Sequence, residues 1–159
     1  MNITLVTVGK LKEKYLKQAI DEYSKRLGRY CKLDIIELPD EKTPDNASEK
    51  EEIQIKEKEG RLILSKIKDN SYVVAMDLQG KEITSEQFSS FIEKCGVTGN
   101  SNIVFIIGGS LGLSDEVRRR ADYKLCFSKM TFPHQLFRVM LLEQVYRAFR
   151  IMKNEPYHK

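Results

Sequence analysis

The sequence predicts an α/β protein with a mostly parallel sheet flanked by helices. Stretches with strand patterns alternate with stretches of helical periodicity along the chain, which is typical of this class. The strongest strand pattern, Ile103–Ile107, has no polar residue, as expected of a central parallel strand that is buried on both faces. The length of 159 residues fits one compact domain, and no repeat or linker divides it. We therefore expect a single domain over residues 1–159.

The first half of the sequence predicts two strands and two helices. Asn2–Val8 is rich in β-branched residues, which predicts a buried strand, and Leu33–Leu38 predicts a second one. Between them, residues 12–30 have the periodicity of an amphipathic helix. The apolar face predicted for this helix consists of Tyr15, Leu16, Ala19, Ile20, Tyr23 and Leu27. After a polar loop, the capping box Ser48-x-x-Glu51 begins a charged helix.

The second half continues the same alternation. Tyr72–Met76 predicts a third strand, which ends in a turn over residues 77–80. A second capping pattern, Thr84-x-x-Gln87, begins the next helix. A short helix follows the central strand, Tyr123–Cys126 predicts a fifth strand, and a long apolar helix comes last. Five strands and five helices are therefore expected.

The composition indicates a cytoplasmic protein. The longest apolar run has five residues, whereas a transmembrane helix needs roughly 20, and the opening residues lack the pattern of a signal peptide. The three cysteines, Cys31, Cys95 and Cys126, have no metal-ligand spacing, which predicts reduced and buried thiols. We therefore expect a cytoplasmic location, no membrane contact and no metal.

Positive charge is concentrated near the C-terminus. From Arg118 onwards the chain has ten Lys and Arg against three Asp and Glu, whereas the first 117 residues have 17 against 20. A basic quarter attached to a nearly neutral body indicates a scaffold that presents a site to a polyanion. The run Arg118–Arg120 is either a solvated helix end or a phosphate contact, and the sequence leaves both interpretations open.

Three predicted strands end in segments suited to ligand binding. In open α/β sheets ligands bind at the carboxyl ends of the strands, where this chain has Met76–Gly80, Gly108–Gly112 and Phe127–Phe132. The glycines lack the spacing of a dinucleotide or P-loop motif. The next helix begins with Asp115 and Glu116, whose carboxylates would repel phosphate. We expect either a site for a nucleoside without phosphates or a purely structural glycine turn.

The long helix after Pro133 is apolar almost all round at its start. This pattern predicts burial on two sides and hence a homodimer, with a central core helix as the alternative. Arg138 falls within the apolar arc of the helix. Its guanidinium must therefore reach solvent, pair with a buried anion or lie at a subunit interface.

Both histidines of the chain lie in this region. His134 follows Pro133 at the helix start, where a structural capping contact is the expected role. His158 lies beside Tyr157 near the C-terminus, where residues are commonly disordered. The pair also offers a stacking ring and a titratable imidazole, which are suited to holding a nucleobase and handling its proton. Disorder and catalysis remain alternatives for the tail.

Four sequence blocks follow one another in the second half of the chain. They are Ile106–Leu113 (IIGGSLGL), Ser128–Gln135 (SKMTFPHQ), Glu143–Ala148 (EQVYRA) and Pro156–Lys159 (PYHK). Together they resemble the RlmH family of small SPOUT-class methyltransferases, and the similarity spans the whole chain. It implies a C-terminal trefoil knot, a homodimer, S-adenosylmethionine as cofactor and 23S rRNA of the ribosome as partner. The implied reaction is methylation of N3 of a pseudouridine, expected to be pseudouridine-1915.

The resemblance also implies the residues of the site. The cofactor-binding residues would be Met76, Gly108, Phe127, Ser128, Lys129, Met130, Thr131 and Phe132. N3 of a uracil-type ring carries a proton at neutral pH, so we hypothesise that His158, or an ordered water beside it, removes this proton. Tyr157 would stack on or orient the base, and Arg138 would stabilise the developing anion or contact phosphate. If one subunit's tail covers the other's pocket, each site is composite.

Two other functions fit the same fold. One is a ribosome- or RNA-binding protein without transfer activity, against which the intact glycine turn and the PYHK tail argue. The other is a tRNA methyltransferase of the same class. The small size argues against it, because no added RNA-recognition domain is visible.

Overall fold

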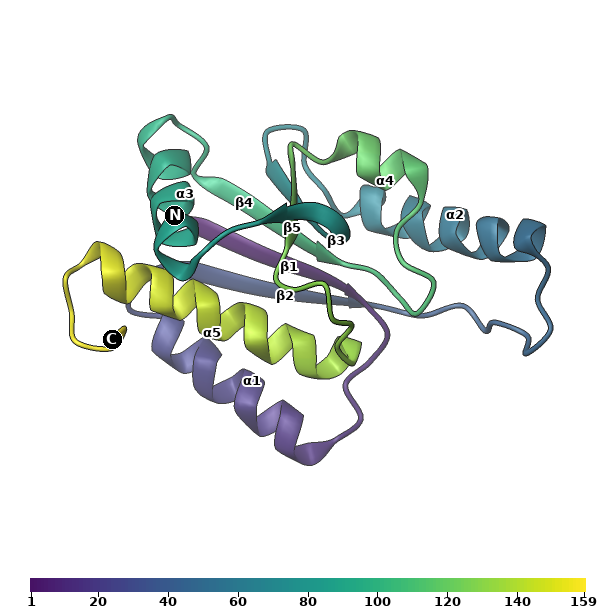
Figure 1. Ribbon diagram of the computed structural model, residues 1–159, viewed down its shortest axis with the longest axis horizontal. Helices are drawn as coiled ribbons and strands as arrows, with labels where there is room; N and C mark the ends of the chain where they lie inside the picture. The colour runs from purple at the N-terminus through teal and green to yellow at the C-terminus, as the bar shows by residue number, and fades with distance from the viewer.

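The protein is a five-stranded parallel sheet between two layers of helices, as the computed structural model of all 159 residues shows (Figure 1). The strands are β1 (Asn2–Val8), β2 (Lys32–Leu38), β3 (Tyr72–Glu82), β4 (Asn102–Ile107) and β5 (Tyr123–Cys126). The helices are α1 (Lys14–Leu27), α2 (Glu49–Ser65), α3 (Ser85–Val97), α4 (Asp115–Arg120) and α5 (His134–Met152). The α/β class predicted from the sequence is confirmed.

The strands follow the order β2-β1-β4-β3-β5, and every neighbouring pair is parallel. β4 lies in the centre, where Ile103–Ile107 is buried throughout, as predicted. α1, α3 and α5 cover one face around a core that includes Phe105 and Leu141, while α2 and α4 cover the other around Ile63 and Val117. Because all strands are parallel, the loops that follow them gather at one edge of the sheet.

Two helices begin at the capping boxes that the sequence predicts. The Ser48 hydroxyl accepts a hydrogen bond from the N–H of Glu51, and the Glu51 carboxylate accepts one from the N–H of Ser48. Thr84 and Gln87 make the same reciprocal pair at the start of α3. These bonds satisfy donors that the first helical turn leaves unpaired.

β3 is longer than the sequence predicts. Its pairing with β5 resumes after an irregularity, so that Leu125 faces both Met76 and Lys81. Residues 77–80 therefore form a bulge within the strand, and the prediction that β3 ends there in a turn is wrong. Gly80 permits the close approach, because a Cβ at this position would lie 2.7 Å from the backbone of β5.

α1 buries a narrower face than the sequence predicts. The helix is shorter than the expected 12–30. Its buried residues are Leu16, Ile20 and Leu27. The sequence places Tyr15 on this face, but the residue is 66% exposed, so that prediction is wrong. Tyr15 is offset from Leu16 by about 100° around the helix and lies in its first turn, where no earlier turn covers the ring.

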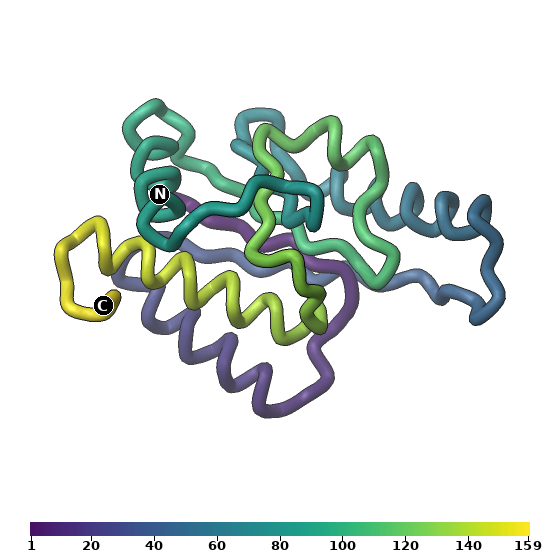
Figure 2. Tube along the Cα trace, in the orientation of Figure 1, coloured from purple at the N-terminus to yellow at the C-terminus, as the bar shows by residue number.

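α5 has 19 residues and packs between α1 and α3. A loop over residues 127–133 connects it to β5, and the residues after Met152 turn back toward the start of α3 (Figure 2). The trefoil knot implied by the RlmH resemblance stays a prediction. No helix of the protein is both long and apolar enough to cross a membrane.

Candidate functional site

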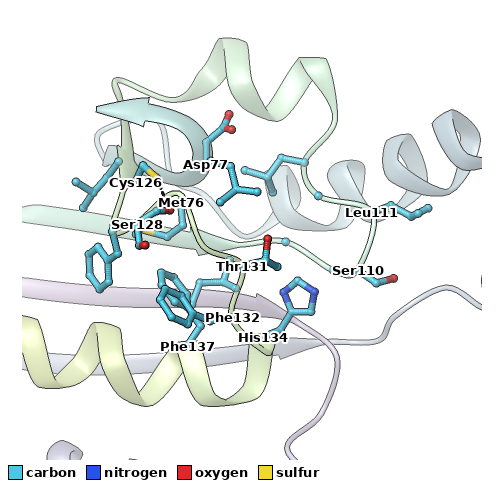
Figure 3. Close-up of a pocket in the computed structure, with 18 of the residues that line it drawn as sticks. Met76, Asp77, Ser110, Leu111, Cys126, Ser128, Thr131, Phe132, His134 and Phe137 are labelled. Atoms are coloured by element: carbon cyan, nitrogen blue, oxygen red, sulfur yellow. Dashed lines mark hydrogen bonds between the residues drawn. The ribbon is translucent and has the colours of Figure 1, made fainter. Parts of the chain in front are cut away.

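A pocket of about 320 Å³ lies at the carboxyl edge of the sheet (Figure 3). Its walls are the bulge of β3, the glycine turn after β4, the loop after β5 and the first turn of α5. The structure thus brings together the three strand ends that the sequence singles out. A cavity of this size suits a nucleoside-sized ligand.

The predicted cofactor residues and the predicted catalytic residues lie in different places. The pocket is lined by Met76, Gly108, Phe127, Ser128, Met130, Thr131 and Phe132. Lys129 is exposed and does not line it. Arg138, Tyr157 and His158 are also absent from its walls. Within one subunit, the structure therefore gathers seven of the eight predicted cofactor residues and none of the predicted catalytic ones.

The glycine turn after β4 forms one wall of the pocket. Gly108 leaves no room for a side chain, because a Cβ there would lie 2.8 Å from Leu113 and 3.0 Å from the carbonyl oxygen of Gly112. Gly112 has a φ of 86°, in the left-handed region that favours glycine. Gly108 is therefore packed against its own turn, whereas the space beside Gly112 is open, since a Cβ there would meet nothing within 4 Å.

The loop after β5 is organised by Ser128 and backed by aromatic rings. The Ser128 carbonyl accepts a hydrogen bond from Cys126 Sγ at 2.9 Å, and its hydroxyl accepts one from the N–H of Met130 at 3.0 Å. The ring centroids of Phe127 and Phe132 lie 5.1 and 6.2 Å from that of Phe137 on α5. These rings give the pocket an apolar wall.

The pocket carries almost no net charge. Asp77 Oδ2 lies 3.0 Å from Nε of Arg118, and the Asp77 side chain is only 5% exposed. His134 is the remaining basic group in the wall. Burial, and then the charge of Arg138, lower the pKa of His134, so its imidazole is neutral at pH 7. Such a pocket suits a nucleoside ligand without phosphates.

Sequence reasoning missed the places of His134 and Arg118 in this pocket. A capping contact is predicted for His134, but its side chain lines the pocket and no side chain caps α5, so the prediction is wrong. The signal for its position is the preceding loop, Phe127–Phe132, which brings the helix start to the carboxyl edge. The partnership of Asp77 with Arg118 has no signal in the sequence, because 41 positions separate them.

The predicted arginine run is largely occupied by contacts within the protein. Arg118 pairs with Asp77, and Arg120 pairs with Asp122 at 3.3 Å. Arg120 also donates to the carbonyl of Ser71 at 3.1 Å. Only Arg119 of the run is exposed and free of an ion pair.

Arg138 ties the start of α5 to the ends of β1 and β2. The residue is 2% exposed, and its Nη1 donates to the Glu37 carboxylate at 2.9 Å. Its Nη2 donates to the carbonyls of Val8 at 3.0 Å and Gly9 at 2.8 Å. The sequence allows pairing with a buried anion, and the structure shows pairing with an anion that is itself partly exposed, since the Glu37 side chain is 37% exposed.

The C-terminal tail is docked on α5 and α3. The Tyr157 hydroxyl donates to Glu143 at 3.0 Å, and the Arg147 guanidinium lies 4.7 Å from the Tyr157 ring centroid. His158 Nδ1 lies 3.1 Å from Arg147, and its Nε2 lies 2.8 Å from Glu86. Because arginine only donates, Nδ1 accepts and Nε2–H donates to Glu86. The tail is therefore ordered against its own subunit.

This docking keeps the tail away from the pocket of the same subunit. Arg147, which contacts His158, follows His134 by 13 residues on one helix, a separation of about 20 Å along its axis.

Burial, and then the bond to Glu143, raise the pKa of Tyr157 to about 12. The phenol therefore remains a hydrogen-bond donor at neutral pH.

The fold and the pocket together define the class of the protein. It is an α/β protein with a nearly neutral, nucleoside-sized pocket at the carboxyl edge of a parallel sheet.

A family model described as "Predicted SPOUT methyltransferase" matches residues 1–158. The chain belongs to this family and, within it, to the RlmH group. A protein from Clostridium perfringens (strain SM101 / Type A) named ribosomal RNA large subunit methyltransferase H 1 is 86% identical over 100% of both chains. One from Clostridium beijerinckii named ribosomal RNA large subunit methyltransferase H is 76% identical, again over 100% of both chains.

The solved structures show the same fold at low sequence identity. A probable methylase family protein from Haemophilus influenzae matches 99% of this chain and 70% of its own length, with a TM-score of 0.55 and 13% identity. This likeness supports the fold of the protein alone and says nothing of its substrate.

Replacing Arg138 by methionine should lower the free energy of unfolding by about 2–4 kcal/mol, because Glu37 and two carbonyls lose a buried donor. Urea denaturation measures this change. Arg119→Met is the matched control, since Arg119 is exposed and has no ion pair, and it should change stability by less than about 0.5 kcal/mol. Equal effects of the two substitutions would contradict the structural role of Arg138.

The pKa of His134 should lie below the ordinary value of 6.5. The unfolded chain then binds this proton at higher pH than the folded protein, so stability falls as pH drops below about 6.5. NMR titration of the His158→Gln variant, in which His134 is the one remaining histidine, measures the folded value directly. A midpoint at or above that of the same variant unfolded in urea would contradict the neutral pocket.

Proposed function

We propose that this protein transfers a methyl group from S-adenosylmethionine to N3 of a pseudouridine in 23S rRNA, in the cytoplasm. The observation that carries the proposal is the nearly neutral, glycine-walled pocket at the carboxyl edge. The full-length relatives named ribosomal RNA large subunit methyltransferase H supply the substrate class. The target atom follows from the RlmH resemblance.

The pocket fits S-adenosylmethionine in size and charge. The cofactor is a nucleoside without phosphates, and the pocket combines a suitable volume with a neutralised ion pair. The backbone at Met76 and Gly108 and the loop over residues 127–132 would hold it. When bound, the cofactor supplies an activated methyl group on a sulfonium. The protein must then orient the nucleophile and remove its proton.

In this proposal His158 removes the N3 proton, directly or through a water, while Tyr157 orients the base. His158 would first leave both Arg147 and Glu86, because Nε2 carries the proton and Nδ1 must be free to accept one from the substrate. The Glu86 side chain is 61% exposed, so water can replace the imidazole there. Arg147 would keep its contact with the Tyr157 ring and so hold that residue in place.

We propose that the active form is a homodimer in which the tail of one subunit serves the pocket of the other. The separation of about 20 Å along α5 argues against a tail that reaches its own pocket. Two large apolar residues near the pocket, Met130 and Leu136, are exposed. A groove of about 460 Å³ beside them, lined in part by Val139 and Met140, offers further apolar surface. A second copy of the chain would cover these groups.

Arg138 acts indirectly in this proposal. Its donors are directed at Glu37, Val8 and Gly9, and it does not line the pocket. We therefore assign it a positioning role, which keeps the start of α5 and its pocket residues in place. Its predicted contact with the developing anion or with phosphate stays a prediction.

Replacing Gly108 by valine should abolish cofactor binding, because the side chain would collide with Leu113 and Gly112. Gly28→Val is the matched control, since Gly28 is an exposed helix end with α-region backbone. Calorimetric titration with S-adenosylmethionine measures binding. Mass spectrometry of 23S rRNA from a deletion strain should reveal one lost methyl group, which the wild-type chain and Gly28→Val restore and Gly108→Val does not.

Other results of this experiment would point to the alternative functions. A wild-type protein that binds no S-adenosylmethionine, with unchanged rRNA in the deletion strain, would favour an RNA-binding protein without transfer activity. A methyl group lost from tRNA in place of rRNA would identify a tRNA methyltransferase.

Co-expression of two inactive chains tests the composite site. One chain carries Gly108→Val and an intact tail, and the other ends at Glu155 and has an intact pocket. If the tail acts across the dimer, mixed dimers should regain about a quarter of the wild-type activity, since half of the dimers are mixed and each has one complete site. Activity that stays absent in verified mixed dimers would show that the tail acts within its own subunit, and activity of the chain ending at Glu155 by itself would show that the tail has no role.

A further inference from the structure

The arginines of the basic C-terminal quarter are mostly neutralised within the fold. Five of them are paired with carboxylates of the same chain. The pairs are Arg118–Asp77, Arg120–Asp122, Arg138–Glu37, Arg147–Glu143 and Arg150–Glu155. Their charges contribute little to the field outside the protein. The number of basic residues in this quarter therefore overestimates the positive charge that is available to bind a polyanion.

A second group of cations has no such partners. Lys10, Lys12, Lys14 and Lys17 are all exposed, and none of them takes part in an ion pair. Glu13 is the single acidic residue among them. This short stretch therefore carries a net charge of +3 within a body whose first 117 residues sum to −3. Four exposed and unpaired lysines therefore lie within eight consecutive residues.

Tyr15 lies in the middle of these lysines and is 66% exposed. Every other tyrosine and every phenylalanine of the chain packs against another aromatic ring, whereas Tyr15 has no aromatic, cation–π or hydrogen-bond partner. Cations that alternate with an exposed ring are suited to nucleic acid, because the cations bind phosphates and the ring stacks on a base.

The fold holds this segment at the rim of the pocket. The N–H of Lys12 donates to Gln135 Oε1 at 3.0 Å, and Gln135 is the neighbour of the pocket residue His134. The N–H of Leu11 donates to the Glu37 carboxylate at 2.9 Å. The segment from β1 to α1 thus runs beside the first turn of α5 (Figure 1). The backbone of this segment is therefore held next to the helix turn that contributes His134 to the pocket.

The start of α1, like that of α5, lacks the side-chain cap and the acidic first turn that α2, α3 and α4 have. Its first turn contains lysines and no acidic residue, and Glu13 at the N-cap makes no side-chain capping bond. α2 and α3 both begin with complete capping boxes and an acidic residue in the first turn. Lysines at a helix start oppose the helix dipole. Lysines at this position do not stabilise the helix, and such a departure is typical of a surface retained for binding.

We propose that Lys10, Lys12, Lys14, Tyr15 and Lys17 form a lysine–tyrosine surface that binds the rRNA strand beside the target nucleotide. The lysines contact phosphates, and Tyr15 stacks on an unpaired base. This surface belongs to the same site as the proposed methyl transfer and rests on that function. In this proposal the segment between β1 and α1 binds the RNA, and the paired C-terminal arginines do not.

The test compares two triple variants with the same change in charge. One replaces Lys10, Lys12 and Lys14 by glutamine. The control replaces Lys25, Lys32 and Lys94, which are exposed, have no ion pairs and lie at the opposite, amino edge of the sheet. Affinity for protein-free 23S rRNA is measured over a range of salt concentrations. Affinity for S-adenosylmethionine is measured in parallel.

The first variant should bind rRNA at least about tenfold more weakly and reduce the slope of log affinity against log salt by about two to three. The control should change neither beyond a small long-range effect, and both should bind S-adenosylmethionine normally. Tyr15→Ala should weaken rRNA binding about tenfold and leave the salt slope unchanged.

If the two triple variants have equal rRNA affinities and equal salt slopes, the proposed RNA-binding surface is wrong. The methyl-transfer proposal would remain intact. A loss seen on whole ribosomal subunits but absent on protein-free rRNA would also overturn the surface, because the partner would then be an acidic protein. Failure of the wild-type chain to bind S-adenosylmethionine would count against the proposed function itself, and the rRNA affinities would still decide the surface.

Discussion

The structure depends on a single buried guanidinium. Arg138 joins Glu37 at the end of β2 to the backbone at Val8 and Gly9, where β1 ends. Burying this charge is costly, and the cost is offset only because three acceptors converge on it. The result fixes the first turn of α5 against the carboxyl edge of the sheet. That turn supplies His134 and Phe137 to the pocket, so the pocket wall is set by an ion pair that the ligand does not touch.

The same carboxylate links the pocket to the surface beside it. Glu37 accepts from Arg138 and also from the N–H of Leu11, within the segment that presents the unpaired lysines. Arg138 in turn helps to keep His134 neutral, because a cation disfavours a second positive charge nearby. One interaction therefore orders the helix start, lowers a histidine pKa and holds the segment from β1 to α1 in place. Cofactor pocket and proposed RNA surface are mechanically a single unit.

Local patterns in the sequence predict the fold well, because the strands, the capping boxes and the three loops at the carboxyl edge depend on neighbouring residues. The site is less predictable, since its polar contacts join distant positions: Arg138 and Glu37 are 101 residues apart. Composition also misleads, because counting charges cannot tell a paired arginine from a free lysine. The prediction that Tyr15 lies on the apolar face of α1 is wrong for a related reason. Periodicity places the ring near that face but does not show whether another part of the chain covers it.

Arginine and lysine occupy different places in this protein because their side chains differ in chemistry. Arginine presents a planar set of donors that several fixed acceptors can satisfy at once, so it suits internal junctions such as that of Arg138. Lysine is a compact, strongly hydrated charge on a flexible stem, which suits contact with phosphates whose positions vary. Five arginines of the C-terminal quarter are paired inside the protein, and four lysines near the start of the chain remain in water. The arginines that join elements of the fold and the lysines of the proposed RNA surface are therefore separate sets.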